Sequence, residues 1–247
     1  VIGLCNVLGS SIAREADAVV YTQAGPEISV ASTKAMCSQM TLLTLLALYY
    51  GQRRGVAGGT EAAALLDALT GVPALLKDTL PALRDTAGRL ARAFAGARSF
   101  FYLGRGPAYA LALEGALKLK ELSYIHAEGY AAGEMKHGPI ALVDPEFPTF
   151  VLALDDELLP KVLSNIVQVQ ARQGKVIALM QRRSVDAADE ALPIPDVNEP
   201  WLLPSAHPLA AAFLALPALQ LFSYEMADYL GKDVDQPRNL AKSVTVE

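Results

Sequence analysis

Three charged residues in one stretch of the sequence have the spacing of groups that act together. Glu114, Lys118 and Glu121 follow one another at intervals of four and three residues, so on a helix they share one face. A carboxylate beside a lysine can serve as a general base whose ionisation the lysine tunes. The same spacing also makes an ion-pair stripe on a solvated helix face, and spacing alone does not choose between the two.

A second candidate is the stretch 127–139, which is rich in small residues and carries Glu128, Glu134 and His137. It is too irregular for a strand and too rich in glycine for a helix, so we expect a loop, the kind of segment that often holds functional side chains. Glu134 and His137 have the spacing of di-iron bundles, but the second motif such a site needs is missing. His126 and Glu128 match half of a zinc deaminase signature without its cysteines. The sequence therefore predicts neither a metal nor a cofactor.

The polar tail is the third candidate. Residues 233–247 have no helical or strand periodicity and include Lys242. A lysine in a terminal tail is usually a surface charge, but this tail is unlike low-complexity disorder because it is rich in specific polar groups.

Apolar segments predict the elements that must position these groups. We expect strands at 1–6, 18–22, 99–103, 150–154 and 175–180, an edge strand at 192–195, and helices at 30–54, 107–124, 157–173 and 207–230. The long helix from residue 30 is expected to be capped by Ser29 or Ser32, and a helical connector at 61–97 to be broken at Pro73 and Pro81. Strands alternating with helices predict buried parallel strands covered on both faces.

One glycine-rich turn partly matches a dinucleotide fingerprint. Gly104-Arg-Gly106 lies between a predicted strand and a predicted helix, but Tyr109 stands where the third small residue belongs. We interpret this segment as a structural turn.

Composition restricts the class of protein. The chain has 247 residues, 52% of them hydrophobic and 19% charged, which predicts compact domains with a large core. The net charge of −5 and the lack of a basic stripe argue against a nucleic-acid partner. The apolar runs 41–50 and 208–222 are too short to span a membrane, so we interpret both as core helices. Cys5 and Cys37 lack a paired spacing, which favours a reducing cytoplasm.

Three segments together resemble the glucosamine-6-phosphate synthase family. They are Val-Ala-Ser-Thr-Lys-Ala at 30–35, Leu-Glu-Gly-Ala-Leu-Lys-Leu-Lys-Glu at 113–121 running on to His-Gly-Pro at 137–139, and the last thirteen residues, 235–247. The likeness extends through essentially the whole chain. It implies an α/β fold of sugar-isomerase (SIS) domains, each a three-layer αβα sandwich with a parallel sheet and the ligand at the carboxyl ends of the strands.

The resemblance also implies a domain order with one partial and one complete SIS copy. Residues 1–57 would be the C-terminal part of a first SIS domain, 58–90 a helical connector, 91–232 the second SIS domain, and 233–247 a tail that closes the active site. We interpret the first residues as a strand cut from a longer protein and not as a signal peptide.

The activity that the resemblance implies is that of a glutamine–fructose-6-phosphate transaminase (isomerizing). Such an enzyme converts fructose 6-phosphate and ammonia to glucosamine 6-phosphate, with ammonia released from glutamine by a separate glutaminase domain. By resemblance, Lys242 would form a Schiff base with C2 of the open-chain sugar. Glu121 would move a proton between C1 and C2, and Lys118 would position it.

The remaining site residues are also carried over from the family. His137 would open the sugar ring from the neighbouring subunit, so the active unit is expected to be a homodimer. Val30, Ser32 and Ala241 would contact the bound sugar.

One family motif has no counterpart in these residues. The phosphate-binding loop Ser-Gln-Ser-Gly-Glu-Thr would lie upstream of Val1, so we expect an unpaired strand edge and weak or no activity of this chain alone. Two alternatives stay open. One is another SIS enzyme, such as a deglycase for amine-linked sugar phosphates, against which the tail argues; the other is a non-catalytic sugar-phosphate sensor.

Overall fold

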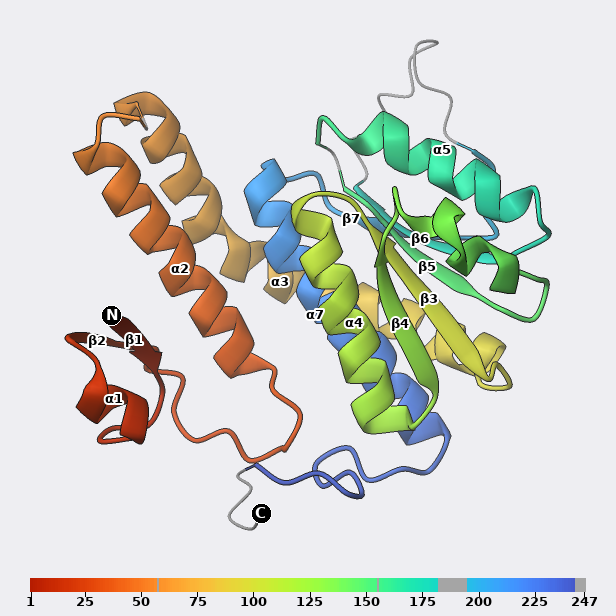
Figure 1. Ribbon diagram of the computed structural model, residues 1–247, viewed down its shortest axis with the longest axis horizontal. Helices are drawn as coiled ribbons and strands as arrows, with labels where there is room; N and C mark the ends of the chain where they lie inside the picture. Colours follow the sequence, from red (N-terminus) through yellow and green to blue (C-terminus); the bar gives the residue numbers. More distant parts are fainter. Residues whose placement is uncertain (57, 155, 182–194, 243–247) are drawn as a thin grey trace.

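The computed structural model describes residues 1–56, 58–154, 156–181 and 195–242, which form two α/β parts joined by a long helix (Figure 1). The first part contains β1 (Ile2–Cys5), α1 (Ser11–Glu15), β2 (Ala18–Tyr21) and α2 (Lys34–Arg53). The joining helix is α3 (Gly59–Phe94), and the second part is built on a five-stranded sheet.

The first part is a small parallel sheet with one short helix. β1 and β2 pair in parallel, and within the described residues they form a sheet of only two strands. The two predicted strands are confirmed, but the prediction that both are buried is wrong, because all four residues of β2 stay exposed or half-buried. The unpredicted helix α1 begins where the Ser10 side chain accepts a hydrogen bond from the Ala13 N–H at 3.4 Å.

Helix α2 begins four residues later than the sequence predicts. Its N-cap is Thr33, and neither Ser29 nor Ser32 caps it. All twenty of its residues are half-buried or exposed, so the prediction that 41–50 is a core helix is also wrong. Only its first turns pack on the larger core, through three side chains: Met36, Cys37 and Met40.

Helix α3 runs unbroken for 36 residues through both Pro73 and Pro81, so the prediction of separate pieces is wrong. A proline inside a helix removes one backbone hydrogen bond and displaces the carbonyl four residues before it. Both prolines lie on the exposed side of α3, where water can satisfy the freed carbonyls. The opposite side, including Leu83, Ala87 and Leu90, is buried against the core.

The second part contains a fully parallel sheet in the order β4-β3-β5-β6-β7. Its strands are β3 (Ser99–Gly104), β4 (His126–Ala131), β5 (Thr149–Ala153), β6 (Val176–Gln181) and β7 (Glu199–Leu203). Its helices are α4 (Pro107–Ser123), α5 (Leu159–Gln170) and α7 (Pro208–Tyr229), with two short 3-10 turns, η1 (Met135–His137) and η2 (Pro139–Leu142). The predicted alternation of strands and helices is confirmed here.

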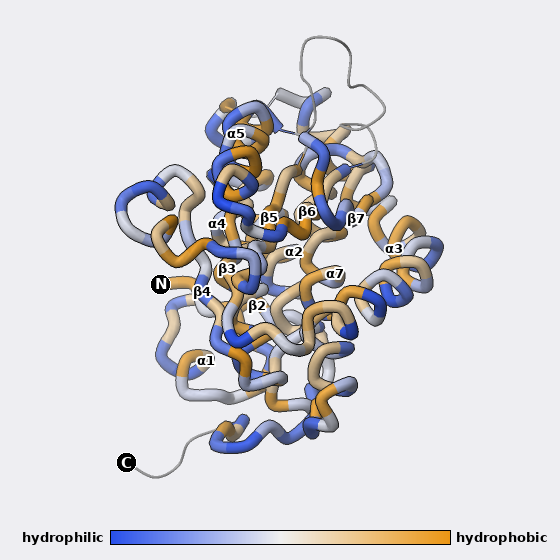
Figure 2. The backbone as a smooth tube through the Cα atoms, turned by 90° about the vertical axis from the view of Figure 1, so that its right-hand side faces the viewer, coloured by the Kyte–Doolittle hydropathy of each residue, from blue (hydrophilic) through white to orange (hydrophobic). Residues whose placement is uncertain are grey.

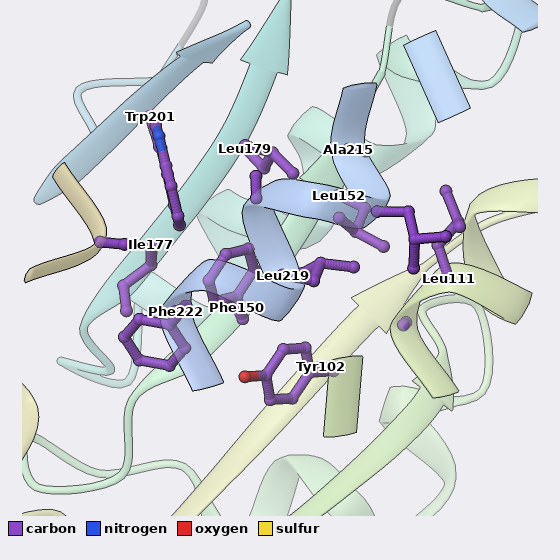
Figure 3. Close-up of a cluster of buried hydrophobic side chains, with 14 of the residues drawn as sticks. Tyr102, Leu111, Phe150, Leu152, Ile177, Leu179, Trp201, Ala215, Leu219 and Phe222 are labelled. Carbon is purple, nitrogen blue, oxygen red and sulfur yellow. The ribbon is translucent and has the colours of Figure 1, made fainter. Parts of the chain in front are cut away.

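Alternate residues of the central strands point into two separate cores. Tyr102, Phe150 and Ile177 pack with α3, α4 and α7 on one face, whereas Phe101 and Val151 pack with α5 on the other. On the first face the Tyr102 and Phe150 rings are stacked with centroids 5.1 Å apart (Figure 3). Residues buried on both faces explain why these strands read as continuous apolar runs.

Strand β4 corrects the prediction of a loop after residue 127. It pairs in parallel with β3 from His126 to Ala131. Its glycine made the segment look irregular, but a Cβ on Gly129 would lie 2.9 Å from both the Cα and the backbone N of Leu113 in α4. A close approach of helix and strand backbones therefore requires glycine at this point of the strand.

The other edge of the sheet is β7, which includes Pro200, a residue that edge strands tolerate. The edge strand predicted at 192–195 falls, apart from Pro195, outside the described residues. Helix α7 is long and apolar enough to cross a membrane. In the fold it is a core helix, as predicted, and its trace is mostly hydrophobic (Figure 2). It packs against α3 and α4.

Candidate active site

The charged face predicted on α4 is an ion-pair cluster around a buried lysine. Lys118 is 3% exposed. Its Nζ donates a short hydrogen bond to Glu121 Oε2 and lies 3.6 Å from Glu114 Oε1. A solvated stripe, the other reading of the sequence, would not bury its lysine. Burial raises the pKa of Glu114, an effect that the charge of Lys118 opposes and that of Glu121 reinforces.

A second cluster forms where the tail meets the segment before α2. Lys242 Nζ donates to Glu27 Oε2 at 2.8 Å and to the Ser29 backbone oxygen at 2.8 Å. The other carboxylate oxygen of Glu27 accepts from the N–H groups of Thr33 at 2.8 Å and Ala35 at 3.2 Å. One carboxylate therefore caps α2 and holds the tail lysine.

The surroundings of Glu27 strongly favour its charged form. Burial alone would raise the pKa of Glu27, because its side chain is only 8% exposed. The hydrogen bonds from Lys242, Thr33 and Ala35 outweigh burial and lower the pKa from 4.5 to about 2. Glu27 is thus a fixed anion at the start of α2 at any pH near neutrality.

The tail is anchored beside this cluster by backbone contacts. The Val30 N–H donates to the Asp235 oxygen at 2.9 Å, and the Ser29 hydroxyl donates to the Val234 oxygen at 3.2 Å. Ala31 is buried with Leu122 of α4 and Ala227 of α7, and Val234 packs on them. In Figure 1 the tail runs from α7 past the end of α4 to the segment that precedes α2. The tail therefore joins the two α/β parts.

Cys37 of α2 lies near charges of both the Lys118 and the Glu27 clusters. Burial raises the pKa of the Cys37 thiol, and the nearby charges of Glu114 and Glu27 add to this effect. Ala31, in the segment that precedes α2, is buried with Leu122, the residue after Glu121 in α4. Together the clusters place a lysine from the tail and carboxylates from α2's start and from α4 around one junction between the two parts.

The junction lies at the carboxyl end of β2 but at the opposite end of the second sheet. Helix α4 starts after the carboxyl end of β3 and runs back along it, so Lys118 and Glu121 lie toward the strands' amino ends. At the carboxyl edge of the second sheet, a separate cavity of about 310 Å³ is lined mostly by apolar side chains beside His207. The predicted site is therefore built on the carboxyl end of the first sheet only.

The structure brings most of the predicted site residues to this junction. Val30 and Ser32 lie in the segment between β2 and α2, and Ala241 adjoins Lys242 on the tail. His137 does not join them. It ends η1 with a side chain that is 75% exposed, and its Nε2 lies 3.9 Å from Glu134 Oε2.

Sequence reasoning did not identify Glu27. A carboxylate six residues before Thr33 carries only a weak signal, that of an acidic group near a helix N-terminus. Its contact with Lys242 spans 215 residues, so the spacing of neighbouring residues could not reveal it.

The other motifs of the sequence do not gather into a larger constellation. His126 Nε2 lies 3.7 Å from Glu128 Oε1, and within the described ranges no three His, Cys, Asp or Glu side chains are grouped as metal ligands. Gly104 and Gly106 form the turn between β3 and α4, where a Cβ on Gly104 would lie 2.2 Å from the Ala108 oxygen. This steric requirement accounts for the first glycine of the motif without a nucleotide.

Comparison with known proteins identifies the fold family. The protein-family model of the SIS domain matches residues 1–49 and 93–227 of this chain, which belong to the two α/β parts. The chain belongs to the SIS domain family. Its architecture of parallel sheets and covering helices is that of an α/β SIS fold.

Several SIS relatives are similar over the whole chain. The glutamine–fructose-6-phosphate aminotransferase (isomerizing) of Bacteroides thetaiotaomicron is 48% identical over 248 residues, covering 99% of this chain and 39% of the relative. The same enzyme of Thermus thermophilus is 48% identical over 246 residues, covering 100% of this chain and 40% of the relative. A solved C-terminal domain of glucosamine-fructose-6-phosphate aminotransferase from Francisella tularensis has a TM-score of 0.88 at 38% identity, covering 96% of this chain and 64% of that one. This chain thus spans about two fifths of the length of its curated relatives.

Proposed function

We propose that this chain forms most of the sugar-isomerase half of a glucosamine-6-phosphate synthase. Its substrate would be fructose 6-phosphate, and its product, formed with ammonia, glucosamine 6-phosphate. The names of the whole-chain relatives support this assignment. The observation that carries it is the position of Lys242, which the tail brings 2.8 Å from a fixed carboxylate at the junction of the two parts.

The chemistry assigned to Lys242 requires its neutral amine. The amine attacks C2 of the open-chain ketose and water leaves, which gives a Schiff base; ammonia then replaces the lysine nitrogen at C2. In the structure the Lys242 Nζ instead donates to Glu27 and to the Ser29 backbone oxygen. In the absence of sugar, the lysine is therefore held in a resting position, and it must leave Glu27 before it attacks.

The proton transfer is assigned to Glu121 on α4. After ammonia has entered, a base removes a proton from C1 and a proton is delivered to C2, which yields the 2-amino aldose. Lys118 holds Glu121 through its short hydrogen bond and lies between the two carboxylates of the cluster. A buried lysine that fixes the base in one orientation supports the role of Lys118 as its positioning group.

The remaining assignments concern partners and compartment. His137, exposed on its own chain, is proposed to reach the sugar of a second subunit and open its ring, which makes the active unit a homodimer. A glutaminase domain elsewhere in the longer protein would supply ammonia, and the phosphate loop would come from upstream residues. Val30, Ser32 and Ala241 are proposed to contact the sugar. We propose a cytoplasmic enzyme, with the boundaries at residues 57, 90 and 232 as first predicted.

The test follows carbon-13-labelled fructose 6-phosphate by NMR, with ammonium chloride as the source of ammonia. It uses this chain and the same chain extended upstream by a phosphate-loop segment. Glu121→Gln should abolish conversion in the extended chain, whereas Glu114→Gln, a matched change on the same face of α4, should retain most of it. Lys242→Met should abolish conversion while sugar binding persists.

The same assay separates the competing functions. A deglycase would act without any requirement for added ammonia. A sugar-phosphate sensor would bind the sugar but show no conversion in any variant. Conversion by Lys242→Met and Glu121→Gln at the wild-type rate would contradict the proposed function.

A further inference from the structure

Tyr124 occupies a backbone position that disfavours tyrosine. It is the C-cap of α4, with φ 64° and ψ 11°, and its N–H donates to the Lys120 oxygen at 3.2 Å. Left-handed backbone at a helix end is usually glycine or asparagine, because a larger side chain is strained there. A strained residue at such a point indicates that its side chain has a role.

The contacts of the Tyr124 side chain identify that role. Its hydroxyl oxygen accepts a hydrogen bond from the Arg238 N–H at 2.8 Å, and the Arg238 guanidinium lies over the ring, 4.3 Å from its centroid. The Lys232 ammonium is 5.8 Å from the same centroid. The Tyr124 side chain therefore accepts one hydrogen bond from the tail and contacts two cations, one in the tail and one directly before it.

These contacts lie at the two ends of a folded segment of the tail. Between Lys232 and Arg238, the Asp233 carboxylate accepts from the N–H groups of Asp235 and Gln236 at 3.0 and 2.9 Å, which closes a compact turn. Tyr124 contacts the residues before and after this turn. The ring thus fixes the segment as a unit.

We propose that Tyr124 is a positioning residue that fastens the C-terminal tail to the end of α4. Tyr124 lies three residues after Glu121, and Arg238 lies four residues before Lys242. The contact therefore joins, by short and defined lengths of chain, the element that carries the base to the element that carries the Schiff-base lysine. It sets where Lys242 lies relative to Glu121, and in this respect it rests on the proposed function.

The contact acts together with the anchoring of the tail to the first α/β part. Val30 and Ser29 hold Asp235 and Val234, and Glu27 holds Lys242. Within the described residues, the contact with Tyr124 joins Arg238 to α4. Val234 also packs on a cluster that includes Leu122 of α4. Without the Tyr124 contact the tail would therefore stay attached at Val234, but Arg238 and the residues after it would lose their register with α4.

The experiment measures hydrogen–deuterium exchange of residues 231–242 in wild type and in three variants at position 124. Tyr124→Leu removes the ring and the hydroxyl and should speed exchange of the tail at least tenfold. Tyr124→Phe keeps the ring and should fall between this variant and wild type. Tyr124→Gly removes the ring but suits the left-handed backbone, so faster exchange in it cannot result from strain at the end of α4.

A matched control distinguishes a specific contact from general loosening. Tyr224 on α7 also lies near an arginine, with the Arg84 guanidinium 5.8 Å from its ring centroid. Tyr224→Leu should leave exchange of the tail unchanged. Exchange of the tail in Tyr124→Leu at the wild-type rate would overturn the proposal.

A second readout tests positioning, with the same variants made in the chain extended upstream by a phosphate-loop segment. Borohydride reduction with fructose 6-phosphate, followed by peptide mass mapping, should give at least tenfold less adduct on Lys242 in Tyr124→Leu than in wild type. Faster exchange of the tail in Tyr124→Leu together with an undiminished amount of adduct on Lys242 would refute the positioning role. Absence of adduct in wild type would instead contradict the proposed lysine chemistry, and the fastening of the tail would still be decided by exchange.

Discussion

Replacing Glu27 by glutamine separates the two tasks of this carboxylate. The lowering of its pKa from 4.5 to about 2 corresponds to about 3 kcal/mol of total stabilisation, at about 1.4 kcal/mol per unit. The Lys242 side chain is 44% exposed, and exposed ion pairs contribute about 1 kcal/mol at most. Solvent screening therefore reduces the contribution of the lysine to about 1 kcal/mol, and the helix amides contribute about 1 to 2 kcal/mol, the usual range for a helix cap.

Glutamine keeps an oxygen that can accept from the Thr33 and Ala35 N–H groups but loses the charge. Glu27→Gln should thus weaken docking of the tail by about 1 kcal/mol, or about fivefold in hydrogen exchange of residues 231–242. It should leave the first turn of α2 almost unchanged. Glu27→Ala removes the helix cap as well and should cost about 2 to 3 kcal/mol, with faster exchange in both segments.

The pH dependence of docking has a definite sign. Because the folded pKa of Glu27 lies below 4.5, the undocked state binds the proton more tightly. The contribution of Glu27 is complete above its unfolded pKa and is lost as the pH falls from about 4.5 to about 2. The difference in tail exchange between wild type and Glu27→Gln should therefore shrink over that range. Equal exchange of the two tails at pH 7 would refute this account of the ion pair.

Three further substitutions test the joining helix and the packing of the second part by urea unfolding. Lys118→Met should destabilise by about 3 kcal/mol, because it leaves two carboxylates near each other without their buried cation; no loss of stability would mean that the cluster is solvated. Gly104→Ala should cost about 2 kcal/mol or more, because its Cβ would lie 2.2 Å from the Ala108 oxygen. Gly71 lies inside α3, and a Cβ at this position would meet nothing within 4 Å. Gly71→Ala should therefore stabilise the protein by about 0.5 to 1 kcal/mol. A loss of stability would contradict the open surroundings of this position.

The fold of the second part was largely predictable because strands that are buried on both faces appear in the sequence as continuous apolar runs. Phe150 and Ile177 lie in runs so apolar that only a covered strand accommodates them. β4 was missed because Gly129 and the polar residues near it carry no strand pattern, and the close approach of α4 that requires glycine is a tertiary contact. The continuity of α3 was missed because local propensity cannot tell that Pro73 faces solvent.

The candidate site was predictable only in part. The spacing of Glu114, Lys118 and Glu121 predicted that they share one face of a helix. Only the packed structure shows that the lysine is buried. The roles of Lys242 and His137 came from resemblance and stay predictions. Glu27 could not be found by pattern, since its partner lies at the other end of the chain.

Reductive trapping of the lysine tests the central proposal most directly. The chain extended upstream by a phosphate-loop segment is treated with fructose 6-phosphate and borohydride, and the modified peptide is mapped by mass spectrometry. The account predicts a single stable sugar adduct on Lys242, which is lost in Lys242→Met and is weaker in the 247-residue chain alone. An adduct on another lysine, or no adduct in an extended chain that binds the sugar, would contradict it.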